Sequence, residues 1–142
     1  MCCGRLLADT HITGVSAGDP TEHLELSPTP TAARDARAFL SRHADGLSEE
    51  AADAAALCAS ELVTNGVLHA RTPLVFGITR GRERLLVTVA DRGEGRPQQP
   101  LPDDQRPSGR GLVLVSAMAE QWGVHDDTDG KTVWFTVSRG RR

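Results

Sequence analysis

The longest helical pattern in the chain runs from Ala51 to Ala70 and has polar residues among leucines. At ~100° per residue, three polar side chains fall within roughly 80° of one another: Glu61, Asn65 and His69. Leu57 and Leu68 share this sector. The opposite side, which we expect to face the core, holds Ala52, Ala56, Ala59, Val63, Val67 and Ala70. Polar groups among leucines are costly unless they meet partners, so the helix has a few satisfied polar residues or forms the wall of a binding site.

Shorter patterns predict two further helices and five strands. Alternation predicts strands at 23–27 and 131–138, and the sequence also predicts strands at 74–79, 84–90 and 122–125. Apolar stripes predict helices at 31–44 and 112–121, and Thr31 and Ser48 are the expected N-caps of the first and the long helix. In the last strand, Thr132 falls on the opposite side from Val133. This order of elements predicts an α+β fold, with a layer of helices over one mixed, mainly antiparallel sheet.

The length of 142 residues indicates one domain. Residues 1–22 show no clear period, and we expect a flexible N-terminal arm followed by a folded domain at 23–142. The segment from Arg96 to Ser108 has four prolines in thirteen residues, so it cannot be a regular element. An irregular loop of this length is usually functional or disordered.

Composition excludes several classes of protein. The chain is 39% apolar and 25% charged, with a formal net charge of −3, and its longest basic run is the last four residues, which disfavours direct nucleic-acid binding. No apolar stretch approaches the ~18 residues of a membrane span, and no signal peptide is evident, so we expect a cytoplasmic protein. Cys2, Cys3 and Cys58 lack zinc or disulfide spacing, and Cys58 is expected to fill the core.

Two glycine-rich motifs suggest ligand chemistry. Asp91-x-Gly93-x-Gly95 follows a buried strand, where a carboxylate can accept a hydrogen bond from an exocyclic amine and glycines allow close approach. Gly109 and Gly111 open a helix, whose free N–H groups and positive dipole end favour phosphate. Taken alone, the first motif is more typical of a tight turn, and the second is equally typical of a plain helix start.

The order of these motifs along the chain is more specific than any one of them. The carboxamide oxygen of Asn65 suits Mg²⁺, which prefers oxygen ligands and usually bridges to substrate phosphates. Glu61, one turn earlier, can orient or deprotonate a hydroxyl. The proline-rich loop between the glycine motifs would be a lid that excludes water. Together these features favour a nucleotide site.

Four segments resemble a known family: ELVTNGVLHA, VADRGEG, SGRGLVLV and WGV…GKTVWF. They look like the N box, the two glycine boxes and the final strands of the GHKL ATPase and kinase superfamily. Within it, the sequence is most similar to the anti-sigma-factor serine kinases. The resemblance covers about residues 24–137 and implies a two-layer α/β sandwich of the Bergerat type.

The resemblance also implies roles for individual residues. Asn65 would be the Mg²⁺ ligand and Glu61 the catalytic base of an ATP-dependent enzyme. Asp91 would bind the adenine amino group, and Thr132 would support the adenine site near it. His69 fits the family pattern and is expected to pack or orient. The remaining residues implied to contact the nucleotide are Gly93, Gly95, Gly109, Arg110, Gly111 and Leu112.

By this resemblance the protein would transfer the γ-phosphate of ATP to a serine of an anti-sigma-factor antagonist and sequester a sigma factor, as a homodimer. An alternative is an ATP-gated protein-binding module with little or no kinase activity. Two further hypotheses are a catalytic fragment of a histidine-kinase-like protein and a domain that kept the fold but lost ATP. The first of these would need a phosphoacceptor hairpin, for which a 22-residue arm is too short.

Overall fold

The computed structural model describes residues 2–70, 72–91, 109–127 and 130–139. Its centre is a five-stranded sheet with the order β1-β2-β3-β5-β4, in which every described pair of neighbouring strands is antiparallel. The strands are β1 (Thr21–Leu26), β2 (Leu74–Arg80), β3 (Arg84–Asp91), β4 (Gln121–Asp127) and β5 (Gly130–Ser138). The sequence predicted a mixed, mainly antiparallel sheet, and the described strand pairs are all antiparallel.

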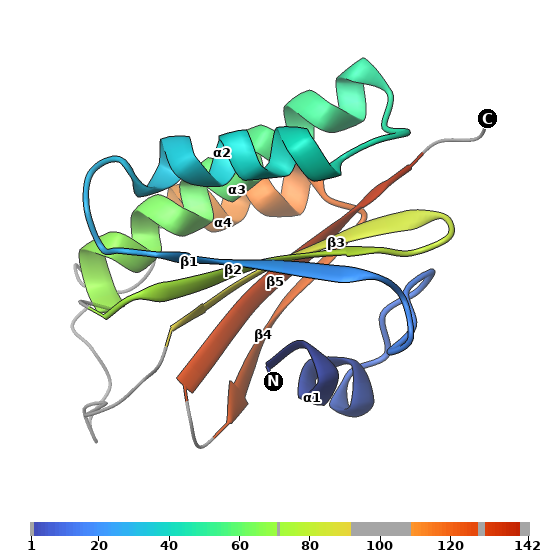
Figure 1. Ribbon diagram of the computed structural model, residues 1–142, viewed down its shortest axis with the longest axis horizontal. Coiled ribbons are helices and arrows are strands. Elements are labelled where there is room, and N and C mark those ends of the chain that lie inside the picture. The colour runs from blue at the N-terminus through green and yellow to red at the C-terminus, as the bar shows by residue number, and fades with distance from the viewer. Residues whose placement is uncertain (1, 71, 92–108, 128–129, 140–142) are drawn as a thin grey trace.

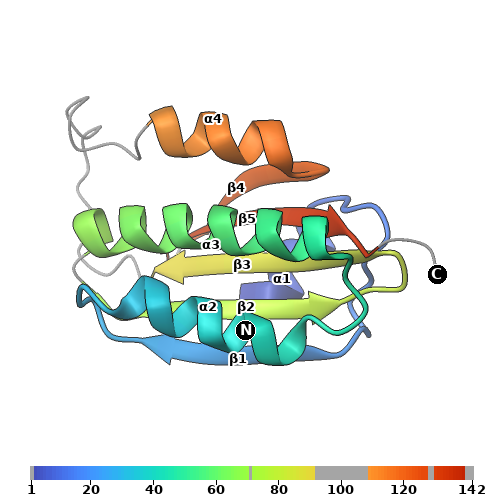
Figure 2. The same ribbon diagram turned by 90° about the horizontal axis from the view of Figure 1, so that it is seen from above.

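Helices lie on both faces of the sheet. One face is covered by α2 (Ala32–His43), α3 (Glu49–Ala70) and α4 (Gly109–Met118), and α1 (Cys2–Asp9) lies on the other face, as Figures 1 and 2 show. We call these the helical face and the outer face. The α+β architecture predicted from the order of elements is confirmed. No described helix combines the length and the apolar character needed to span a bilayer.

The main core lies between the sheet and the three helices of the helical face. Along β3, Leu85, Val87 and Val89 point into this core, whereas Leu86 belongs to a second cluster on the outer face. A strand buried on both faces needs apolar residues at successive positions, which accounts for the unbroken run of apolar residues in β3. Thr132 lies on the outer face, because alternation places it opposite Val133, which packs against the main core.

The N-terminal segment is packed against the sheet, instead of forming the flexible arm expected from the sequence. Leu6 and Ile12 are buried against Leu86 and Trp134 on the outer face. Sequence periodicity does not reveal this, because the two apolar residues are covered by strands far away in the chain. Burial of apolar surface holds the segment in place.

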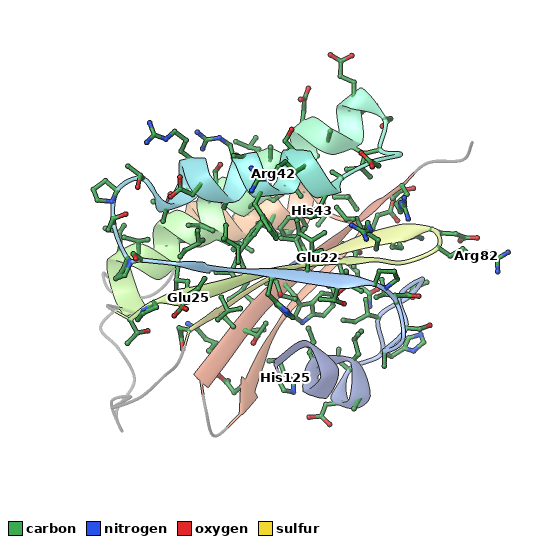
Figure 3. The ribbon with its side chains drawn as sticks, in the orientation of Figure 1. Glu22, Glu25, Arg42, His43, Arg82 and His125 are labelled. Atoms are coloured by element: carbon green, nitrogen blue, oxygen red, sulfur yellow. The ribbon has the colours of Figure 1, made fainter. Side chains whose placement is uncertain are left out.

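Polar contacts join the same segment to β4. The Nε2 atom of His125 lies 3.1 Å from the carboxylate oxygen Oδ2 of Asp9, and Figure 3 shows His125 beside α1. The side chain of Gln121 accepts a hydrogen bond from the backbone N–H of Thr13 and donates one to the carbonyl of His11, both at 3.1 Å. These contacts fix the segment to the edge strand next to β5.

The two predicted N-caps have different outcomes. The Oγ of Ser48 accepts a hydrogen bond of 3.0 Å from the backbone N–H of Ala51, so the cap of α3 is confirmed. Thr31 is at the N-cap position of α2 as predicted, but its side chain makes no capping hydrogen bond. With φ −89° and ψ 0°, Thr31 already has a helical backbone, and its hydroxyl lies 3.1 Å from that of Thr29.

The buried side of α3 is rotated from the one that the sequence pattern predicts. The residues of α3 that line the main core are Ala55, Cys58, Ala59, Leu62 and Val63, whereas Ala52, Ala56 and Val67 are only partly buried. Leu57 and Leu68 are 44% and 66% exposed. The polar sector is therefore open to solvent along its leucines. Within it, Asn65 alone among the described side chains is buried, at 9% exposure.

Candidate functional site

Apart from Thr132 in β5, the predicted site residues that the structure describes come from α3, β3 and α4. The last turns of α3, the end of β3 and the first turn of α4 lie together at one end in Figure 2. In sequence these elements are separated by β2 and by residues 92–108, which lie outside the described residues. The fold therefore gathers the N-box residues, Asp91 and the second glycine motif at one end.

Close packing at Gly66 brings α3 next to β2. A Cβ atom added to Gly66 would lie 2.9 Å from Cδ1 of Leu74, so this glycine allows the helix to approach the strand. Leu74 is the cross-strand partner of Asp91. The helical turn of Asn65 and Gly66 thus lies over the end of the β2–β3 hairpin where Asp91 is found.

Asn65 has an unsatisfied amide. Its Nδ2 atom is buried and has no hydrogen-bond partner. An unpaired buried donor costs roughly 1–3 kcal/mol, and most such groups in folded proteins are paired. A ligand that brings oxygen atoms to this position would remove that cost.

Glu61 is half-buried one turn before Asn65. Glu61 follows Cys58 by three residues in α3. Burial, and then the charge of Glu61, raise the pKa of the Cys58 thiol to about 11. A thiol with this pKa stays protonated at neutral pH and is a poor nucleophile. The expectation that Cys58 fills the core is confirmed, since its side chain is fully buried.

Asp91 ends β3 in a half-buried position on the helical face. Its Oδ1 accepts a hydrogen bond of 3.2 Å from the backbone N–H of Lys131 in β5. Facing residues in a sheet share a side, so Asp91 points to the same face as Leu74, which packs in the main core. The carboxylate is thereby held at the end of the sheet where α3 ends.

Thr132 does not share this face. It is buried, at 3% exposure, and pairs with Ala90 in β3 and with His125 in β4. Because side chains alternate along a strand, these pairs place Thr132 on the outer face, away from Asp91. Lys131, which the sequence did not single out, is the β5 residue beside Asp91, and only the register of β5 against β3 identifies it.

The residues predicted to bind phosphate are described only in part. The backbone of α4 begins at Gly109, so the second glycine motif opens a helix as predicted. The side chains of Arg110 and Leu112, and that of His69, are outside the described part of the structure, as are the whole of Gly93 and Gly95. Gly111 lies in the first turn of α4.

Among the described residues, no three His, Cys, Asp or Glu side chains gather as metal ligands. An open pocket of about 600 Å³ lies elsewhere, between residues 7–19 and the β2–β3 turn, and adjoins none of the predicted site residues. Arg82, at the rim of that pocket, points outward in Figure 3.

Comparisons with known proteins address the fold and the family. The model of the histidine kinase-like ATPase domain family matches residues 26–137. No curated protein matches the chain. One similar solved structure is the crystal structure of the RsbU and RsbW domains of Rv1364c from Mycobacterium tuberculosis, with a TM-score of 0.64 and 22% identity. The likeness covers 89% of this chain but 35% of the solved one, and it shows a shared fold.

Proposed function

The chain belongs to the histidine kinase-like ATPase domain family, and from this membership we propose that it is an ATP-binding regulator that phosphorylates a protein partner on serine. The partner would be an anti-sigma-factor antagonist, and the protein would also sequester a sigma factor. Support for this specific role comes from the resemblance of the N box and glycine boxes to anti-sigma-factor serine kinases. The fold shared with a structure that includes an RsbW domain agrees with it.

The observation on which ATP binding rests is the pair formed by Asn65 and Asp91. The buried amide of Asn65 lacks a partner, and the carboxylate of Asp91 is held at the same end of the sheet. Asp91 would accept a hydrogen bond from the adenine amine. Asn65 would donate its unpaired Nδ2–H to a phosphate oxygen, and its Oδ1 would ligate Mg²⁺. These residues fit the group that the family implies.

Glu61 would act on the protein partner. Bound Mg-ATP supplies the phosphoryl group. As a half-buried carboxylate one turn from Asn65, Glu61 would accept the proton of the attacking serine hydroxyl. The first turn of α4 would stabilise negative charge through its free backbone N–H groups.

Titration calorimetry with Mg-ATP tests the binding step. We expect the native protein to bind, and Asp91→Asn to bind at least tenfold more weakly, since an amide NH₂ would face the adenine amine. Glu61→Gln is the matched control, because it also replaces a carboxylate by an amide but is not expected to contact the adenine ring. Native protein that gives no binding heat would overturn the proposal.

Phosphate transfer separates the kinase from the ATP-gated binding module. With Mg-ATP and candidate antagonists, the native protein should transfer phosphate to serine, whereas Glu61→Gln should bind ATP normally and lose at least a hundredfold in transfer rate. If Glu61→Gln keeps both binding and regulation, the protein is the binding module. The homodimer and the cytoplasmic location remain parts of the same proposal.

A further inference from the structure

A hydroxyl without a partner lies just before β2. The Oγ1 atom of Thr72 is buried and makes no hydrogen bond, although Pro73 beside it is exposed. A buried hydroxyl gives up its hydrogen bonds to water, so a folded protein normally pairs it. Thr72 belongs to none of the motifs that the sequence singled out.

Thr72 lies in the short connection between α3 and β2. It comes two residues after Ala70, where α3 ends, and two residues before Leu74, where β2 begins, and the chain bends at Thr72. Leu74 itself lies under Gly66 and opposite Asp91. The unpaired hydroxyl therefore lies at the end of the sheet that holds Asp91.

A second unpaired atom lies on the helix above. Asn65 Nδ2, like Thr72 Oγ1, is buried without a partner. Asn65 directly precedes Gly66, which contacts Leu74. Two unsatisfied polar atoms from different elements thus flank the same part of the fold, where a single bound molecule could satisfy both.

We propose that Thr72 is a ligand-binding residue of this site and that its hydroxyl hydrogen-bonds the purine side of a bound nucleotide, next to Asp91. A hydroxyl both donates and accepts, and therefore fits the edge of a purine, where donors and acceptors alternate. This inference rests on the proposed function, since it requires a nucleotide.

Replacement of Thr72 by valine gives two opposite effects under this proposal. Thr72→Val removes the unpaired hydroxyl at nearly constant volume, so the melting temperature of the ligand-free protein should rise by roughly 2–4 °C. The dissociation constant for Mg-ATP should rise about three- to tenfold, because the nucleotide loses its partner. A hydroxyl with a structural role would instead lower the melting temperature when removed.

Two variants provide controls. Thr72→Ser keeps the hydroxyl and should keep the native affinity for Mg-ATP. Thr136→Val removes another buried and unpaired hydroxyl, which lies on the outer face of the sheet opposite Leu86. It should stabilise the protein in the same way and leave the affinity for Mg-ATP unchanged.

The calorimetric outcomes separate this inference from the proposed function. If the native protein does not bind Mg-ATP, the proposed function fails. If the native protein binds and Thr72→Val has the same dissociation constant, the inference about Thr72 alone is overturned, and a water molecule satisfies the hydroxyl. Should Thr72→Val fail to fold by circular dichroism, Thr72→Ala provides the same loss of the hydroxyl and must weaken binding for the inference to stand.

Discussion

At the scale of single residues, Cys58 is protonated more firmly than an ordinary thiol. Burial, and then the nearby charge of Glu61, raise its pKa from 9.0 to about 11. The folded protein therefore holds this proton more tightly than the unfolded chain does. The resulting stabilisation is complete below pH 9 and is lost as the pH rises toward 11.

We expect the free energy of unfolding of the native protein to fall by roughly 2 kcal/mol more than that of Cys58→Ala between pH 8 and pH 11. Urea unfolding at several pH values measures this difference. Subtracting the Cys58→Ala curve removes the titration of all other groups. Parallel pH curves for the two proteins would contradict the burial of an un-ionised thiol at this position.

At the scale of elements, the long helix α3 begins at a true cap. Ser48 accepts a hydrogen bond from the N–H of Ala51, and Glu49 and Glu50 place negative charge in the first turn, where the helix dipole favours it. Because α3 holds both Glu61 and Asn65, the cap contributes to the stability of the element on which the site depends.

Ser48→Ala should lower the free energy of unfolding by about 1 kcal/mol, as the loss of a serine cap usually does. Chemical denaturation measures the change. Ser41→Ala, at an exposed position inside α2, is the matched control and should be neutral or slightly stabilising, since alanine is the better helix former. Equal effects of the two substitutions would show that Ser48 does not act as a cap.

At the scale of the whole molecule, the sheet separates the N-terminal segment from the candidate site. Leu6, fully buried, packs with Leu86 and Trp134 on the outer face, whereas Asn65 and Asp91 lie on the helical face. The segment before residue 26 also lies outside the part that matches the family. We therefore expect the segment to support the stability of the sheet without contributing to nucleotide binding.

Leu6→Ala should cost about 2–4 kcal/mol of stability, as truncation of a buried leucine does, and leave the dissociation constant for Mg-ATP within twofold of native. Thermal unfolding and calorimetry at low temperature measure the two quantities. Leu7→Ala, at a half-buried neighbour, should cost less. A large loss of affinity in Leu6→Ala would mean that the two faces are coupled.

Much of the secondary structure was predictable because it depends on local sequence. Short β-prone runs, two of them alternating, identified all five strands, and the line of Glu61, Asn65 and His69 identified the helix that holds the site. Each of these signals lies within some twenty neighbouring residues. The order of elements then indicated the α+β class, because antiparallel hairpins and a layer of helices follow from short connections.

Other features required pairings between distant segments. Which strand residue lies beside Asp91 depends on the register of β5 against β3, and this register selects Lys131 and places Thr132 on the outer face. The burial of Leu6 depends on Trp134, more than a hundred residues later. The unpaired hydroxyl of Thr72 is likewise a property of its surroundings. Local sequence was sufficient to identify the strands, the helices of the helical face and the residues suited to nucleotide chemistry. Only long-range packing determined the place of α1 and which residues meet, because burial and hydrogen-bond satisfaction depend on neighbours that local sequence does not specify.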